Sequence, residues 1–204
     1  MIQLKHVSLF FGSRPLFRDL SLEVPAGGRL LIRGASGSGK TSLLRLILGF
    51  RRPDSGEVIL DDTPLNVRTV WEMRRRMAYV SQEVELGRGS VEAFFREAFS
   101  FRGNRDLVYE KQDAVTLLEE FGLDASTLGA ELETLSGGER QRIAIIMTLL
   151  LKRDIYLLDE ITSALDQELK TRISAYFSRL KKVTLVVASH DKVWHGQGFQ
   201  TIDL

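Results

Sequence analysis

The residues GASGSGKT, numbers 34–41, stand between the segment 29–33, whose three central residues are apolar, and the apolar-periodic segment 41–50. They fit the spacing of a glycine, any four residues, and then Gly-Lys-Ser/Thr. The residues before them predict a strand, and the residues after them predict a helix. A strand, a glycine-rich loop and a helix in this order indicate an α/β fold built around a phosphate-binding loop.

Each residue type in this loop has a chemical reason. Glycines let successive backbone N–H groups turn toward one anion, and the following helix adds the positive end of its dipole. Lys40 is expected to reach the β- and γ-phosphates, and the Thr41 hydroxyl is expected to bind Mg²⁺. The pattern arises by chance in only on the order of one chain in a hundred, which disfavours an ordinary turn. The nucleotide-binding residues expected here are Gly34, Ser36, Gly37, Ser38, Gly39, Lys40, Thr41 and Ser42.

A second apolar run, 155–158, ends in Asp159 and Glu160. A strand that ends this way places Asp159 at the carboxyl edge of a sheet, where it can hold Mg²⁺. Glu160 can then accept a proton from, or orient, a water aligned with the γ-phosphate. Many strands end in a solvated charge, so this pair gains its meaning from the phosphate loop.

A third string, LSGGERQR at 135–142, stands at the start of a predicted helix. Ser136 and the two glycines can form another anion-binding helix start. Ser136 can also be a plain N-cap with Glu139 as its capping-box partner. The two interpretations are compatible, because the cap builds the helix while the glycines leave room for a phosphate.

LSGGE resembles the signature sequence of ABC ATPases, and the resemblance covers essentially the whole chain in the family's order. It implies that Gln82 is the Q-loop glutamine, that 163–166 is the D-loop and that His190 is the switch histidine. It also places Phe11 where the family has an adenine-stacking ring, with Phe10 as a competitor. The implied catalytic residues are Lys40, Gln82, Glu160 and His190; the implied Mg²⁺ ligands are Thr41, Gln82 and Asp159.

The resemblance further implies that Ser136, Gly137 and Gly138, together with Asp166, contact the ATP site of a second copy. A homodimer with two ATP molecules at its interface is therefore expected. The expected partner is an integral membrane permease, which would hold the chain at the inner face of the cell membrane. Ile161 and Thr162 resemble, more narrowly, the ATPase subunits of bacterial iron-efflux (FetAB-type) exporters.

The 204 residues are expected to form one domain of three parts. We expect a mainly parallel core sheet with flanking helices, an antiparallel β part at the start, and a helical signature part at about 83–135. The core and β parts would span about 1–82 and 136–204. Expected strands are 2–11, 20–24, 29–33, 57–60, 77–80, 155–158 and 183–188; expected helices are 41–50, 91–99, 106–121, 136–151 and 166–180.

Composition limits the remaining classes. The 28 Lys and Arg residues nearly balance the 27 Asp and Glu residues, so no overall field attracts nucleic acid. Cysteine is absent, which excludes disulfides. The start does not resemble a signal peptide, and the longest apolar stretch, 143–151, is too short for a membrane span. The alternative is a soluble ABC-type ATPase of DNA repair or translation, but long heptad repeats and a second phosphate loop are both missing.

Overall fold

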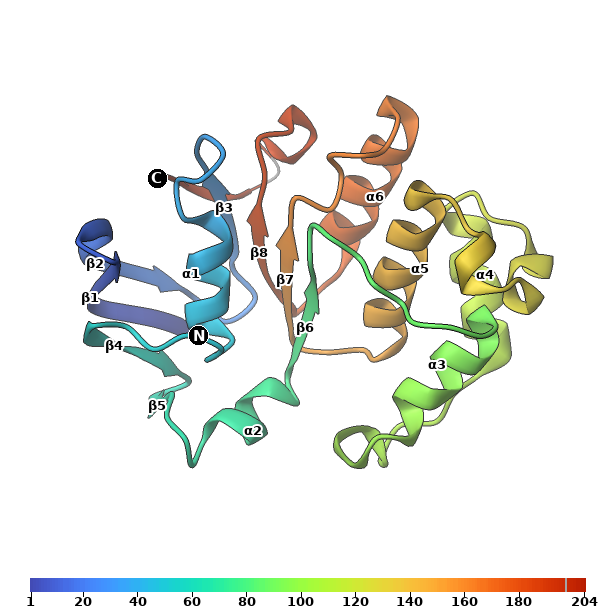
Figure 1. Ribbon diagram of the computed structural model, residues 1–204, viewed down its shortest axis with the longest axis horizontal. Helices are drawn as coiled ribbons and strands as arrows, with labels where there is room; N and C mark the ends of the chain where they lie inside the picture. The colour runs from blue at the N-terminus through green and yellow to red at the C-terminus, as the bar shows by residue number, and fades with distance from the viewer. Residues whose placement is uncertain (197) are drawn as a thin grey trace.

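A computed structural model describes residues 1–196 and 198–204 of the chain. Its centre is a parallel sheet with the strand order β6-β7-β8-β3-β9 (Figure 1). Because the strands are parallel, their carboxyl ends meet at one edge, where loops from distant parts of the sequence come together. The strands are β3 (Arg29–Arg33), β6 (Met77–Val80), β7 (Ile155–Asp159), β8 (Thr184–Ala188) and β9 (Gln200–Asp203).

The parallel sheet is covered on both faces. Every residue of β7 and β8 is buried, and alternate side chains enter two different hydrophobic clusters. Leu157 packs in a cluster with helix α1 (Lys40–Ile47), whereas Tyr156 packs in a cluster with α5 (Gly137–Leu150) and α6 (Gln167–Arg179). Covering both faces explains the continuous apolar runs of these strands.

A second, antiparallel sheet has the order β2-β1-β4-β5. Its strands are β1 (Ile2–Phe11), β2 (Arg14–Val24), β4 (Ser55–Leu60) and β5 (Thr63–Pro64). Its buried side chains, among them Leu4 and Val58, share a cluster with the apolar face of α1. The first helix is therefore held between the two sheets, and the loop before it is fixed from both sides.

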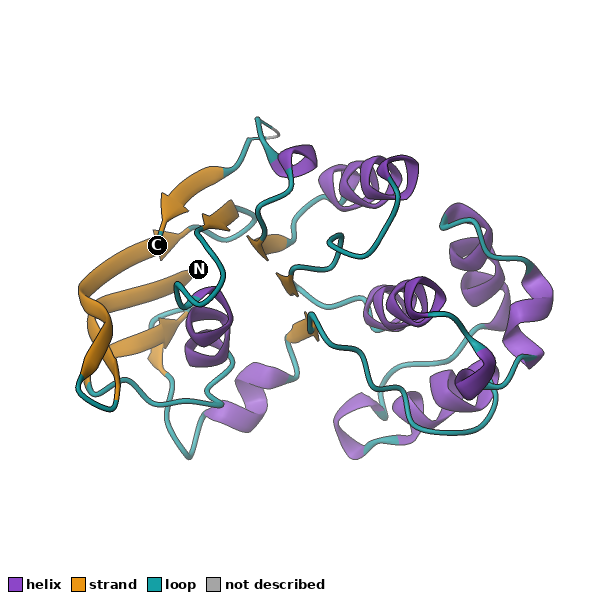
Figure 2. Ribbon diagram, turned by 45° about the horizontal axis from the view of Figure 1, so that its top comes forward, coloured by secondary structure: helices purple, strands orange, loops and turns teal. Residues whose placement is uncertain are grey.

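The middle of the chain is helical and, within the described residues, contributes no strand. It contains α3 (Val91–Ser100), α4 (Lys111–Glu120) and three short 3₁₀ turns, η1 (Arg102–Asn104), η2 (Ala125–Gly129) and η3 (Leu132–Thr134). Figure 2 shows these helices beside α5, away from the antiparallel sheet. Phe95 and Phe99 of α3 join the cluster that also contains α5.

Several predicted boundaries are wrong. The helix expected over 41–50 ends at Ile47, because Gly49 has φ +67°, which a helix cannot use. The helix expected over 106–121 begins only at Lys111, because the preceding chain inserts Tyr109 against Phe95 and Phe99. The second strand begins at Arg14 and not at Leu20, as one arm of a long hairpin.

Three elements were not expected from the sequence. They are β5, the short helix α2 (Val70–Arg74) and the edge strand β9. In β9 only Ile202 is half-buried, so no apolar run marked it. Arg33 holds Asp203 of this strand through two hydrogen bonds of 2.8 Å.

Candidate functional site

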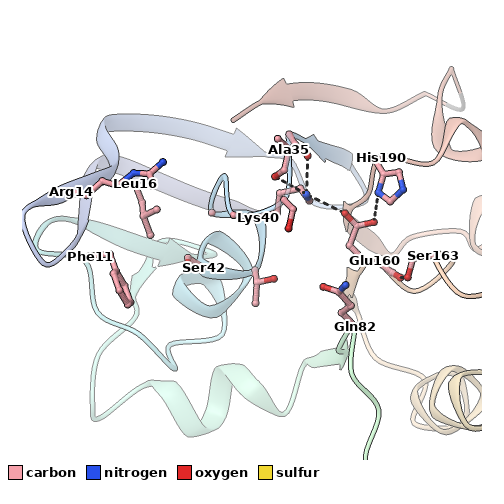
Figure 3. A pocket seen from close by; sticks show the side chains of 15 residues that line it. Phe11, Arg14, Leu16, Ala35, Lys40, Ser42, Gln82, Glu160, Ser163 and His190 are labelled. Atoms are coloured by element: carbon pink, nitrogen blue, oxygen red, sulfur yellow. Dashed lines mark hydrogen bonds and ion pairs between the residues drawn. The ribbon is translucent and has the colours of Figure 1, made fainter. Parts of the chain in front are cut away.

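A cavity of about 610 Å³ lies at the carboxyl edge of the parallel sheet, where the loop before α1 meets the loops after β6, β7 and β8. Its volume falls within the range of small-molecule sites. Figure 3 shows side chains from these separate loops pointing into one space. The predicted site residues that line it are Phe11, Gly34, Ser36, Gly37, Gly39, Lys40, Thr41, Ser42, Gln82, Glu160 and His190. Arg14, Leu16, Ala35 and Ser163 also line it and were not singled out as ligands.

Two glycines of the loop leave no space for a side chain. A Cβ at Gly34 would lie 2.4 Å from Ser38 Oγ and 2.8 Å from the Leu204 carbonyl oxygen. A Cβ at Gly39, where φ is +109°, would lie 2.9 Å from the Phe17 ring. The loop therefore closes tightly on its neighbours at these two positions, and its residues line the cavity.

Lys40 belongs to this loop. Its ammonium donates hydrogen bonds to the carbonyl oxygens of Gly34, at 2.9 Å, and Ala35, at 3.3 Å. It also forms an ion pair with Glu160 Oε1 at 3.1 Å, and both side chains are less than a tenth exposed. The cation that suits a triphosphate is thus paired with the carboxylate predicted to act in catalysis.

Glu160 follows β7 with φ +49°, a left-handed conformation that is uncommon for a residue with a side chain. The Glu160 N–H donates to the Ala188 carbonyl at 2.8 Å, and Ser163 Oγ donates to the Glu160 carbonyl at 2.9 Å. Oε2 lies 3.0 Å from His190 Nδ1 and has no hydrogen-bond partner among the described residues. These contacts turn the carboxylate into the cavity beside Lys40 (Figure 3).

Asp159 borders an adjoining cavity of about 590 Å³, shared with Thr41 and Gln82. Burial raises the pKa of Asp159, and hydrogen bonds from Thr41 and Tyr79 oppose that rise. Tyr79 donates to Oδ2 at 3.3 Å, whereas the buried Oδ1 has no hydrogen-bond partner among the described residues. A free, buried carboxylate oxygen beside a hydroxyl and an amide fits a hard cation.

No group of three or more His, Cys, Asp or Glu side chains suited to a metal occurs in residues 1–196 and 198–204. Mg²⁺ is commonly held by one or two carboxylates together with phosphate oxygens of the substrate. The Asp159, Thr41 and Gln82 set therefore fits Mg²⁺ when a triphosphate supplies the missing oxygens. Tyr79 escaped the sequence analysis, because nothing in an apolar strand marks the one hydroxyl that faces Asp159.

The structure separates the two aromatic candidates. Phe11 lines the main cavity, its side chain is 70% exposed, and Arg51 lies 6.0 Å from the centre of its ring. Phe10 does not line the cavity. Its backbone N–H donates to Asp54 at 2.7 Å and its carbonyl accepts from Arg51. Phe10 therefore ties the end of β1 to the loop between α1 and β4.

The signature residues do not line the cavity of their own chain. Ser136 caps α5 in a full capping box: its Oγ accepts from the Glu139 N–H, and Glu139 accepts from the Ser136 N–H at 2.8 Å. Around Gly137 nothing lies within 4 Å of an added Cβ, so this helix start is open. Asp166, also outside the cavity, caps α6 through the Leu169 N–H at 2.9 Å. The signature residues and the phosphate loop, which are expected to bind one ATP molecule together, are therefore apart in a single chain.

Figure 1 nevertheless shows the phosphate loop before α1 and the N-terminus of α5 at the same edge of the molecule. Figure 2, with this edge turned forward, shows both helices nearly end-on and separate. One chain thus presents the starts of α1 and α5, the two predicted anion-binding sites, in the same direction.

Comparison with known proteins agrees with these features. Residues 17–163 match the protein family described as ABC transporter. The ATP-dependent lipid A-core flippase of Methylococcus capsulatus (strain Bath) is 37% identical over 196 residues, which are 92% of this chain and 32% of that protein. The flippase of the same name from Escherichia coli (strain K12) is 34% identical over 197 residues, 92% of this chain and 34% of that protein. The chain spans about a third of the length of these curated relatives.

Two solved structures resemble the whole fold. One is a dimeric post-hydrolysis state of the ATP-binding cassette MJ0796 bound to ADP and Pi, with TM-score 0.84, 26% identity, and coverage of 100% of this chain and 94% of that chain. The other is a bacterial Atm1-family ABC exporter with ATP bound, with TM-score 0.80, 25% identity, and coverage of 93% and 34%. These likenesses confirm the predicted fold class. Within the described residues, no helix has the length and apolar character needed to cross a membrane.

Proposed function

Because this chain belongs to the ABC transporter family, we propose that two copies of it close around two Mg-ATP molecules and hydrolyse them. The observation that carries this proposal is the separation of the two anion-binding helix starts, which face the same way from one chain. A two-fold axis between copies brings the α5 start of each over the phosphate loop of the other. Residues 1–204 act in this proposal as one domain, with 83–135 as its helical part.

The loop, two side chains and one ring of the cavity have defined roles in the proposed reaction. The loop from Gly34 to Thr41 wraps the phosphates, and Lys40 leaves Glu160 to contact the β- and γ-phosphates. Glu160 then orients the attacking water and accepts its proton, while His190 contacts the γ-phosphate. Phe11 stacks on the adenine ring. Ser136, Gly137, Gly138 and Asp166 of the second copy complete the site.

Asp159, Thr41 and Gln82 would hold Mg²⁺. The ion would supply positive charge that offsets the charge of the phosphate oxygens during transfer. Tyr79 donates a hydrogen bond to one oxygen of Asp159, and the other oxygen, which has no hydrogen-bond partner among the described residues, would bind the ion.

A crosslinking experiment tests the dimer directly, because the chain has no natural cysteine. Arg14→Cys places a thiol at the rim of the ATP cavity, and Arg140→Cys places one in the first turn of α5. In the Glu160→Gln background, a short bismaleimide should join two copies carrying these changes only when ATP and Mg²⁺ are present. A control pairs Arg140→Cys with Val108→Cys, an exposed position of the helical part. No crosslink in any nucleotide state, or equal crosslinking by the control, would overturn the proposed dimer.

We propose further that the dimer powers export through a membrane partner at the inner face of the membrane. The relatives named as flippases and as an exporter support this role. So does a cavity of about 640 Å³ between α2 and the turn after α3, which contains two exposed rings, Trp71 and Phe101. Five arginines line it: Arg74, Arg75, Arg102, Arg105 and Arg153.

This arginine surface has little negative charge of its own. Asp106 pairs with Arg75 at 3.1 Å and approaches Arg105 at 3.7 Å, and it is the one acid in an ion pair with these five arginines in the described residues. Since the net charge of the chain is only +1, acidic residues elsewhere in the chain offset this local excess. It suits an acidic segment that carries apolar side chains. By contrast, the rings of Phe94 and Phe95 in α3 pack in or against the core.

A photoreactive side chain tests the partner. In native membranes, a photo-crosslinker at Trp71 should capture an acidic segment of a multi-span membrane protein, and one at Val108 should not. Capture of lipid, of a ribosome or of DNA-repair factors would contradict the export role.

The narrower iron-efflux function rests on Ile161 and Thr162. Both are buried, and Thr162 is hydrogen-bonded to Asp191, so these residues belong to the packing beside the site and not to a cargo-facing surface. Measuring metal and lipid transport by the chain together with its captured partner tests this proposal.

A further inference from the structure

A largely buried ion pair stands directly beside the predicted switch histidine. Asp191 Oδ1 accepts a hydrogen bond from Lys170 at 2.8 Å, and Asp191 Oδ2 accepts one from Thr162 Oγ1 at 2.5 Å. The side chains of Lys170 and Asp191 are 17% and 13% exposed. None of these three residues touches the ATP cavity, so its chemistry leaves them unexplained.

The three residues join three separate segments. Thr162 is fully buried and lies two residues after Glu160, Asp191 follows His190, and Lys170 belongs to α6. Trp194 adds a hydrogen bond from its indole N–H to Thr162 Oγ1 at 3.4 Å. The network therefore ties the loop that bears Glu160 to the loop that bears His190, with α6 as the support.

The backbone around His190 is fixed in the same place. Ser189 donates its N–H to the Ile32 carbonyl at 3.1 Å, and the Asp191 N–H donates to Ser189 Oγ at 3.0 Å. The His190 ring itself is 65% exposed, and in the described part of the chain its one ion-pair contact is Glu160. The position of the ring is therefore set by the residues that flank it and not by packing of the ring.

The surroundings of Asp191 favour its charged form. Burial acts to raise the pKa of Asp191, but the hydrogen bonds from Lys170 and Thr162 outweigh it and lower the pKa. A buried pair with both oxygens satisfied defines a single geometry, because loss of either partner leaves a buried charge unpaired.

We propose that Asp191 and Lys170 are positioning residues, which fix His190 relative to Glu160 so that both reach the terminal phosphate together. The inference rests on the proposed ATPase function and deepens it. Small displacements of a catalytic group lower turnover much more than substrate binding, since misplacement of about 1 Å can cost 10²-fold.

Three variants test the role. Asp191→Asn should lower kcat by about 10- to 100-fold while the KM for ATP changes less than about 2-fold. Lys170→Arg, which keeps the charge, should retain most of the activity. Asp191→Asn removes the charge partner of Lys170, so the neutral double variant Lys170→Met/Asp191→Asn is measured with it, below the melting temperature of each protein. The matched control is Asp113→Asn, which breaks the exposed Lys152–Asp113 pair of 2.9 Å and should leave kcat unchanged.

A double-mutant cycle separates positioning from mere stability. If Asp191 acts through His190, adding Asp191→Asn to His190→Ala should lower kcat no further. Full additivity of the two changes, or wild-type kcat in the folded neutral double variant, would overturn the positioning role. The proposed ATPase function would be unaffected by that result. A wild-type chain that hydrolyses no ATP in the same assay would overturn the proposed function and this inference with it.

Discussion

The Lys40 ammonium lies 3.1 Å from a carboxylate oxygen of Glu160, and both groups are almost completely buried. Buried ions are costly unless they are paired, so each of these charges stabilises the other. A triphosphate that attracts Lys40 would break the pair and leave Glu160 directed at the water side of the phosphate. In the proposed reaction, the lysine that would bind the phosphate also restrains the proposed base until nucleotide is present.

The first prediction concerns Glu160→Gln. Removing the carboxylate should lower kcat at least about 100-fold, because the general base is lost. It should also tighten ATP binding, because Lys40 is no longer neutralised by an acid. Phosphate release and nucleotide titration measure the two effects, and size-exclusion chromatography with ATP should show a lasting dimer. Glu168→Gln, an exposed acid of α6, serves as the control. A variant that stays monomeric with full activity contradicts the role of Glu160.

The second prediction concerns the adenine contact. Phe11→Ala should raise the KM for ATP about 10-fold, because stacking of a base on a ring is worth about 1–3 kcal/mol. Phe11→Tyr should keep the KM for ATP near the wild-type value, since the ring face is kept. Phe10→Ala is the comparison, because Phe10 lies outside the cavity. A larger effect at Phe10 than at Phe11 would reverse the assignment.

The third prediction concerns Tyr79. Tyr79→Phe removes the 3.3 Å hydrogen bond to Asp159, so it should raise the Mg²⁺ concentration for half-maximal activity about 10-fold. The measurement is a Mg²⁺ titration of ATPase activity at saturating ATP. Burial raises the pKa of both Tyr79 and Tyr156 to about 12, but Tyr156 belongs to the opposite cluster. Tyr156→Phe is therefore the control, and an equal shift in both variants would argue against a specific role of Tyr79.

The elements that could be predicted from the sequence are those whose apolar pattern agrees with their burial in the fold. The apolar runs of β3, β6, β7 and β8 are buried on both faces, and the motif residues at their ends follow from this burial. The edge strand β9 went unseen because an edge needs few apolar side chains, and here a salt bridge between Arg33 and Asp203 helps to hold it. The late start of α4 depends on Tyr109 reaching two rings of α3, a tertiary contact without a local signal.

The same contrast between local patterns and tertiary contacts applies to the site. Motif spacing predicted that the phosphate loop and the acidic end of strand 155–158 meet, because parallel strands deliver their carboxyl ends to one edge. The positions of Phe11, Gln82 and His190 were expected only from the family resemblance. Motif spacing could not predict that Lys40 is paired with Glu160, or that Asp191 is held by Lys170 from α6. Such pairs depend on the relative position of loops that are far apart in the sequence.

The last prediction concerns pH and the start of α5. Hydrogen bonds from the Ser136 side chain and N–H lower the pKa of Glu139 from its ordinary 4.5. A carboxylate with a depressed pKa in the folded state stabilises the fold above its unfolded pKa and loses this effect as the pH falls through the folded value. The unfolding free energy of the wild type should therefore exceed that of Glu139→Gln by about 0.5 kcal/mol at neutral pH, a small value because the site is solvent-screened. The difference should shrink below about pH 4.5 in urea titrations. Glu133→Gln, in the turn before the helix, should show no such trend, and a difference that grows on acidification would contradict the capping box.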